Sequence, residues 1–167
     1  MTMRRFAPLL VATLFLVVAG CTNPFSSTQS SGTAAPAEAP EVKAAIEQFV
    51  AKYNSHDAAG VAEFYADDAN FRWIEDGRVV YEGRTAAVTG LTSFFAGFGD
   101  SRLDAYDIKV SMLTDESAVA SFKFSQVVAA NGQASLKFEG TMSLAMSDRD
   151  GGWKILVGHK SSNGGPH

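Results

Sequence analysis

The sequence SAVASFKFSQVVAANGQASLKFEGTMSLAMS, residues 117–147, contains two runs in which apolar and polar side chains alternate. Alternation with a period of two predicts β-strands that have one buried and one solvated face. In both runs the apolar side chains occupy the even positions, namely Ala120, Phe122, Phe124, Val128, Leu136, Phe138, Met142, Leu144 and Met146. We therefore predict two antiparallel strands joined at Asn131-Gly132-Gln133, with the even face in the core.

Two further strands are expected on either side of this pair. The pattern predicts strands over 103–113, 117–130, 134–147 and 152–160, separated by short polar turns. Four consecutive strands with short connections form an antiparallel meander.

The chain before the meander is mainly helical in pattern. Apolar residues recur every three or four positions, which predicts helices over 40–54, 58–65 and 85–98. Asp57 precedes the second of these segments and Thr85 begins the third, and these two residues are expected to be the N-caps.

A hairpin separates the second and third helices. Asp76-Gly77 is a two-residue turn signal between short β-runs over 69–75 and 78–82. Helices grouped on one face of a mainly antiparallel sheet make an α+β domain. We assign this domain to residues 41–162 and expect residues 163–167 to be a disordered tail.

The N-terminus predicts export and lipid anchoring. Arg4 and Arg5 precede an apolar run over 6–19, which is shorter than the roughly 20 residues that a spanning helix needs. The run ends in Val-Ala-Gly before Cys21, which resembles a bacterial lipoprotein cleavage box. We read 1–20 as a signal peptide and 21–40 as the lipidated cysteine with a disordered, Ser/Thr/Ala/Pro-rich tether. The alternative is an ordinary secreted protein that is cleaved nearby and keeps a free thiol.

This reading places the protein in the bacterial cell envelope, with the bilayer as a partner through acylated Cys21. Thr22 follows the cysteine, and the absence of aspartate there favours the outer membrane, facing the periplasm, over the inner membrane in a Gram-negative cell.

Composition excludes several classes of function. Hydrophobic residues make up 46% of the 167 residues and the net charge is −4, which favours a folded core and argues against nucleic acid as a partner. A single cysteine excludes an intrachain disulfide and a cysteine-rich metal site. No histidine spacing indicates a metal site, and no nucleotide-binding fingerprint is present, so we expect neither a metal nor a cofactor.

The order of elements resembles the SnoaL-like group of the nuclear-transport-factor-like superfamily. Three local matches carry the resemblance: Asn54-Ser55-His56-Asp57 with Val61 and 64–68, Trp73 with 81–84, and 151–155 with His159 and Ser161. The resemblance implies a cone-shaped fold, in which a strongly curved sheet wraps its concave face around three helices and a pocket. It also implies frequent dimerisation through the sheet. It does not imply one function, because the superfamily includes isomerases, dehydratases, cyclases, binding proteins and assembly modules.

Strand parity predicts which residues line that pocket. Directly opposite residues share a face, so the expected turns align Tyr106, Phe124, Gly140 and His159 in one row across the inner face. A glycine between aromatics and a histidine leaves space there. Gln126 lies one step along on the same face, and Tyr53 and Trp73 complete the predicted ligand pocket. A β-bulge would shift this register.

Two functions remain open. No carboxylate falls on the inner face of the meander, which argues against proton-transfer catalysis and favours a protein that binds a small apolar or amphipathic molecule, or a dimeric assembly module. The alternative is an isomerase, cyclase or dehydratase in which His159 and Tyr106 are the candidate catalytic residues. The alternative interpretation of His159, which buried polar groups favour in general, is a hydrogen-bonded core histidine. A homodimer through the solvated sheet face, which carries Val119 and Val127, is expected in either case.

Overall fold

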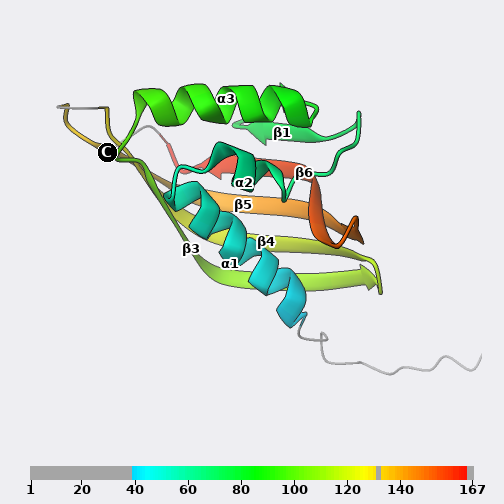
Figure 1. Cartoon of the computed structure of the whole chain (residues 1–167). Helices are drawn as coiled ribbons and strands as arrows, with labels where there is room; N and C mark the ends of the chain where they lie inside the picture. The colour runs from blue at the N-terminus through cyan, green and yellow to red at the C-terminus, as the bar shows by residue number, and fades with distance from the viewer. Residues whose placement is uncertain (1–38, 131–132, 165–167) are drawn as a thin grey trace, which may run out of the picture. The chain divides into compact units, whose positions relative to one another are not determined.

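The computed structural model describes residues 39–130 and 133–164, and within them it has the predicted α+β fold. Figure 1 shows three helices lying over one face of a sheet. The helices are α1 (Pro40–Asn54), α2 (Ala58–Ala62) and α3 (Arg84–Gly97). The strands are β1 (Arg72–Glu75), β2 (Arg78–Glu82), β3 (Arg102–Thr114), β4 (Ser117–Val128), β5 (Leu136–Arg149) and β6 (Gly152–Ser162).

The six strands form one mixed sheet in the order β2-β1-β6-β5-β4-β3. Strands β3 to β6 form the predicted antiparallel meander, and β1 pairs with β6 in parallel. The sheet is curled but not closed. The parallel pair places the hairpin beside the last strand of the chain, and this determines which side chains meet in the pocket.

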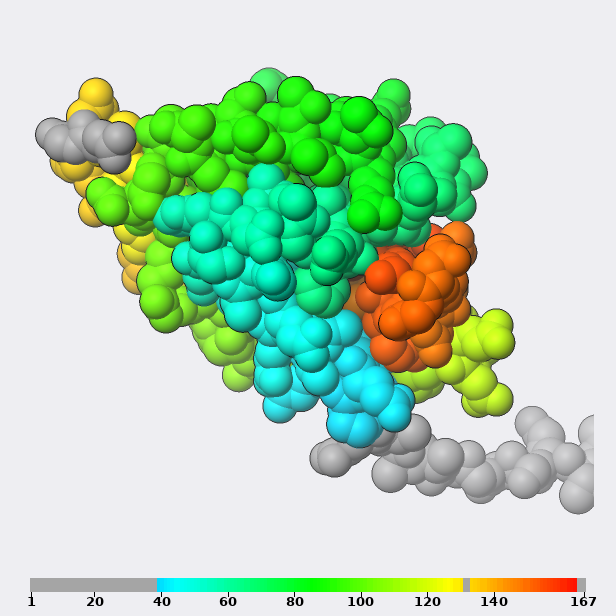
Figure 2. Space-filling view, viewed as in Figure 1, coloured from blue at the N-terminus to red at the C-terminus, as the bar shows by residue number. Residues whose placement is uncertain are grey.

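Helix α1 has the predicted bounds and packs through one apolar stripe. Val42, Ile46, Phe49 and Tyr53 are buried, at the spacing of three and four that places residues on one helix face. Helix α2 lies between α1 and α3, and the three helices form a layer over the sheet (Figure 2). No helix in the described ranges is long and apolar enough to cross a membrane.

Helix α2 begins as predicted and ends earlier. The Asp57 side chain accepts a hydrogen bond from the backbone N–H of Gly60 at 2.8 Å, as an N-cap does. The helix stops at Ala62 because the following segment joins the sheet. The backbone N–H of Ala66 donates to the carbonyl of Ile155, and the N–H of Ile155 donates to the carbonyl of Phe64.

The predicted cap of α3 is wrong. Gly83, with a φ of 77°, is the N-cap residue, the helix begins at Arg84, and no side chain caps it. A positive φ favours glycine, so the N-cap lies two residues earlier than the threonine signal suggested.

The predicted register of β4 against β5 is confirmed. Phe124 pairs with Gly140, and the pairing runs without a shift from Ser117–Ser147 to Val128–Leu136. The even positions of both strands face the helices, and Phe122, Phe124, Leu144 and Met146 are almost fully buried there.

The predicted register of β3 is correct over part of the strand only. Lys109 to Met112 pair as expected, but a bulge between Tyr106 and Lys109 shifts the pairing beyond it. Asp107 takes a φ of 55° at this bulge. Ala105 therefore pairs with Phe124, and Tyr106 pairs with Lys123 on the outer face, where Tyr106 is 43% exposed. The predicted Tyr106–Phe124 pair is wrong.

The predicted register of β6 is also wrong. A two-residue turn at Asp150-Gly151, both with positive φ, replaces the expected four-residue loop. The register then shifts at Leu156, which has no partner between the pairs Ala145–Val157 and Met146–Ile155. After this bulge the even positions face the helices. His159 consequently pairs with Ser143 on the outer face, and Lys160 pairs with Met142 on the inner face.

Candidate functional site

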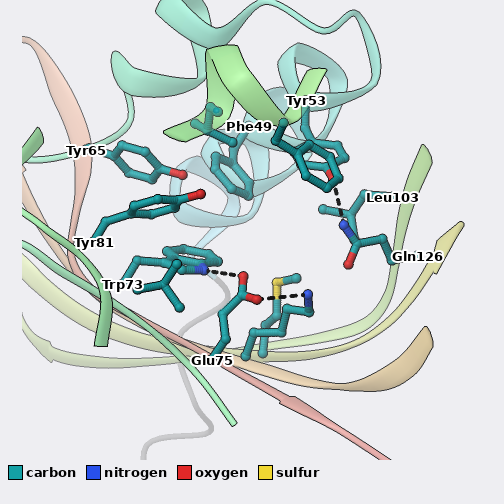
Figure 3. A pocket seen from close by; sticks show the side chains of 13 residues that line it. Phe49, Tyr53, Tyr65, Trp73, Glu75, Tyr81, Leu103 and Gln126 are labelled. Atoms are coloured by element: carbon teal, nitrogen blue, oxygen red, sulfur yellow. Dashed lines mark hydrogen bonds and ion pairs between the residues drawn. The ribbon is translucent and has the colours of Figure 1, made fainter. Parts of the chain in front are cut away.

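A pocket of about 120 Å³ lies on the inner face of the sheet, between the sheet and helices α1 and α3 (Figure 3). Its lining is mainly aromatic and aliphatic, with a small number of polar groups. The lining residues are Phe49, Tyr53, Tyr65, Trp73, Glu75, Val80, Tyr81, Leu91, Phe94, Leu103, Gln126, Met142 and Lys160.

Close packing against two glycines positions two aromatic walls of the pocket. A Cβ atom at Gly158 would overlap the six-membered ring of the Trp73 indole, and a Cβ atom at Gly90 would overlap the Tyr81 ring. Gly90 is unfavourable inside α3 by intrinsic propensity, and this contact is the reason that the helix carries it. Phe49 fills the third side, with its ring centroid 6.2 Å from that of Trp73.

An ion pair lies in the pocket wall. The parallel register places Glu75 of β1 beside Lys160 of β6, and the Lys160 Nζ atom is 3.4 Å from Glu75 Oε2. The indole N–H of Trp73 donates to Glu75 Oε1 at 2.9 Å. Only 12% of the Lys160 side chain is exposed, and its ammonium lies over the rings of Phe124 and Phe138 at 5.7 and 5.9 Å from their centroids. Both carboxylate oxygens of Glu75 thus accept a hydrogen bond within the protein.

A second polar group lies on the wall formed by α1 and β4. Gln126 Nε2 donates to the Tyr53 hydroxyl at 2.6 Å. Burial raises the pKa of Tyr53 to about 12, although hydrogen bonds from Gln126 and Ser101 act in the opposite direction. The phenol therefore stays protonated at neutral pH.

Two more phenols lie on the opposite wall. Figure 3 shows the hydroxyls of Tyr65 and Tyr81 close to each other and directed into the pocket. Burial raises the pKa of both phenols, and the negative charge of Glu75 adds to the effect. Both remain neutral hydrogen-bond donors at neutral pH, and neither hydroxyl has a hydrogen bond within residues 39–130 and 133–164.

The structure brings together three of the predicted pocket residues and leaves four outside the lining. Tyr53, Trp73 and Gln126 line the pocket. Phe124 and Gly140 pair with each other on the same inner face, beside it. Tyr106 and His159 lie on the outer face, so the predicted inner cavity between these two side chains is wrong.

Sequence reasoning missed Glu75, Lys160, Tyr65 and Tyr81. Glu75 and Tyr81 lie on the hairpin and Tyr65 lies just after α2. All three are outside the meander, where the alternation of side chains was used to predict the pocket. Lys160 was missed because of the bulge at Leu156. The uninterrupted apolar run Ile155-Leu156-Val157 was the available signal, because a continuous alternation would have placed a polar residue at its centre.

His56, the other histidine within the described residues, has a structural role. The ring Nε2 of His56 donates to the carbonyl of Ser101 at 2.9 Å, and the ring packs 5.0 Å from that of Phe95. No cluster of three or more histidine, cysteine, aspartate or glutamate side chains that could hold a metal occurs in the described part of the chain.

Comparison with known families identifies the fold. The model of a family described as a SnoaL-like domain matches residues 42–163. No curated protein has a matching sequence.

Solved structures with the same fold have low sequence identity. A protein of Novosphingobium aromaticivorans provisionally named scytalone dehydratase has a TM-score of 0.69 and 10% identity, over 75% of this chain and 83% of its own. An NTF-2-like protein of Shewanella oneidensis has a TM-score of 0.60 and 15% identity, over 73% and 97%. A type 2 hexachlorocyclohexane dehydrochlorinase has a TM-score of 0.64 and 14% identity, over 75% and 88%. At these identities the likeness concerns the fold alone.

Proposed function

The chain belongs to the SnoaL-like domain family, and from the pocket that this fold forms here we propose that it binds a small apolar or amphipathic molecule between the helices and the sheet. One observation carries the proposal: a mainly aromatic concavity of about 120 Å³ with a few convergent polar groups. This combination is the usual form of a small-molecule site, since the apolar walls supply affinity and the polar groups fix orientation.

The hydrogen bonds that the Glu75 carboxylate already accepts favour binding over proton transfer as the function. A general base needs a lone pair directed at the substrate. Glu75 already accepts from the Trp73 indole and from Lys160, one donor on each oxygen. These donors stabilise the carboxylate and orient it toward protein groups.

An enzyme is the second candidate, and a specific observation supports it. Glu75 places a carboxylate in the pocket from β1, outside the meander strands to which the expectation against catalysis applied. A carboxylate that shares a pocket with the phenol donors Tyr65 and Tyr81 is suited to a dehydration or isomerisation. The candidate catalytic groups are then these three residues, in place of His159 and Tyr106.

A ligand screen with a matched pair of variants tests the proposal. Val80 lines the pocket and is 43% exposed, whereas Val79 pairs with Ile74, does not line the pocket and is 49% exposed. We expect metabolite hits that raise the melting temperature of the wild type and of Val79→Phe, but not of Val80→Phe, because the larger side chain occupies the opening. A ligand at a hundred times its Kd stabilises by about 2.7 kcal/mol.

The outcomes separate the candidate functions. Hits that are recovered unchanged support binding, and hits that are converted to product support the enzyme. Hits that stabilise Val80→Phe as strongly as the wild type would contradict the proposal, as would a complete absence of hits.

We also propose that the protein is a lipoprotein of the bacterial cell envelope, anchored through Cys21. The support is the sequence of basic residues, apolar run and small residues that precedes this single cysteine. These residues lie outside the described structure. Metabolic labelling with a fatty-acid probe is expected to mark the wild type and not Cys21→Ser, and equal labelling of the two would contradict the proposal.

A further inference from the structure

Only one of the two polar atoms of the Gln126 carboxamide has a hydrogen-bond partner. Its Nε2 donates to the Tyr53 hydroxyl at 2.6 Å, while Oε1 has no hydrogen-bond partner. No other side-chain nitrogen or oxygen atom that is itself fully shielded from solvent lacks a partner in the described ranges. Gln126 is only 6% exposed, and Figure 3 shows its oxygen directed into the pocket. A buried acceptor without a donor costs free energy, so a molecule that brings a donor to this atom gains that energy on binding.

The opposite wall presents the complementary chemistry. The hydroxyls of Tyr65 and Tyr81 lie on the other side of the pocket from Gln126 (Figure 3). As neutral phenols they donate hydrogen bonds, and an oxygen acceptor on a ligand can receive them. The pocket therefore offers an acceptor on one wall and donors on the other.

The charges and size of the pocket restrict the ligand further. Glu75 and Lys160 neutralise each other at 3.4 Å, so a charged ligand group would meet a like charge as well as an opposite one and would lose its hydration. Benzene fits in an apolar cavity of about 150 Å³. The space of about 120 Å³ between Phe49, Trp73 and Tyr81 is smaller than that cavity, so the pocket admits at most a single ring between these walls.

We infer that the pocket selects an uncharged, single-ring molecule that donates a hydrogen bond to Gln126 Oε1 and accepts one from the Tyr65 and Tyr81 hydroxyls. Hydroxylated aryl ketones and aldehydes are of this class. The inference rests on the proposed binding function and adds the chemical class of ligand to it.

Four matched probes separate the two ends of the ligand. They are 4-hydroxyacetophenone, acetophenone, 4-ethylphenol and ethylbenzene, which differ only in the ring hydroxyl and in the carbonyl oxygen. Isothermal titration calorimetry uses the full chain in detergent micelles. The partition of each probe into protein-free micelles is measured separately, and every Kd is expressed on the free aqueous concentration of the probe. We expect the hydroxyl to tighten Kd about tenfold in both pairs, since a hydrogen bond to a buried unpaired group contributes about that factor. We expect 4-hydroxybenzoate, which carries a charge, not to bind.

Variants show which protein atoms cause the gain in affinity from the ring hydroxyl and from the carbonyl oxygen. Gln126→Leu keeps a side chain of similar size and removes Oε1, so we expect the gain from the ring hydroxyl to fall below about twofold while acetophenone binds as before. Tyr106→Phe is the matched control: it removes a phenol hydroxyl on the outer sheet face, outside the pocket lining, so the gain persists. Tyr81→Phe is expected to reduce the gain from the carbonyl and to keep that from the hydroxyl.

Each contrary outcome has a distinct meaning. Equal Kd values for 4-hydroxyacetophenone and acetophenone in the wild type overturn the inference, and binding of both leaves the proposed function intact. This comparison needs no variant, so it decides the question even if Gln126→Leu does not fold. If none of the four binds while the metabolite screen gives hits that Val80→Phe abolishes, the inference falls and the proposed function stands. If neither the four probes nor any metabolite in the screen binds, both the inferred ligand class and the proposed binding function are contradicted.

Discussion

Replacing Gly158 by alanine tests how the aromatic wall of the pocket is held. Gly158 is buried in β6 and pairs with Trp73 of β1. The added methyl group would overlap the Cε3 and Cζ3 atoms of the Trp73 indole. Trp73 is 5% exposed and packs against Phe49 and Tyr65, so its ring has little room to move. We expect the indole to shift and its hydrogen bond to Glu75 to lengthen or break.

The expected cost follows from overpacking. An extra methyl group in a tightly packed site destabilises a protein by about 1–3 kcal/mol. We expect a value in the upper half of that range, because loss of the Trp73–Glu75 hydrogen bond adds to it. Urea denaturation measures the change in the free energy of unfolding, and near-ultraviolet circular dichroism reports the indole environment.

A second glycine provides the control. Gly97 is the last residue of α3, and a Cβ atom there would meet nothing within 4 Å. Gly97→Ala makes the same chemical change and is expected to be neutral or to stabilise by up to about 1 kcal/mol. A Gly158→Ala variant as stable as Gly97→Ala, with an unchanged indole signal, would refute the packing of Trp73 on Gly158.

Three further predictions concern the rest of the domain. The hydrogen bond from Gly60 and the charge of Lys52 hold the pKa of Asp57 below its usual range, so its contribution to stability is lost as pH falls through that lowered value. Asp57→Ala should lower the melting temperature at pH 7 and flatten its acid dependence, and an unchanged melting curve would contradict the N-cap. Burial raises the pKa of Tyr53 from 10.0 to about 12, so the free energy of unfolding should fall as pH rises between these values. The fall should be less steep in Tyr53→Phe. Equal slopes of the free energy of unfolding against pH in the wild type and the variant would contradict this. Val119, 39% exposed on the outer sheet face, is expected to lie in a homodimer interface, so light scattering should show a dimer for the wild type and a monomer for Val119→Lys, and a monomeric wild type would reject the dimer.

Side-chain alternation predicted the register where the backbone is regular. The turn expected at residues 131–133 and an uninterrupted alternation predicted the pair Phe124–Gly140, and the pair is correct because no residue is inserted in either strand. The same reasoning failed at Asp107 and Leu156, where one inserted residue reverses the face of everything beyond it. Both candidate catalytic residues, Tyr106 and His159, lay beyond such a bulge.

The polar groups of the pocket depend on contacts between distant segments. Glu75 meets Lys160 only because β1 pairs with β6 in parallel, and local periodicity contains no information about that pairing. Gln126 and Tyr53 were found because each lies on a clear apolar face, one of a strand and one of a helix. The sequence therefore predicted the walls built from regular elements and missed the charged pair.

The two tryptophans of the chain allow the most direct test of ligand binding in the pocket. Trp73 lines the pocket, whereas Trp153 lies near the β5–β6 turn, opposite Asp148, and is not part of the lining. Their indole N–H groups give two resonances in a ¹⁵N–¹H correlation spectrum, assigned with Trp73→Phe. We predict that a bound molecule shifts the Trp73 resonance and leaves that of Trp153 in place. A bound molecule that shifts only Trp153, or neither resonance, would contradict it.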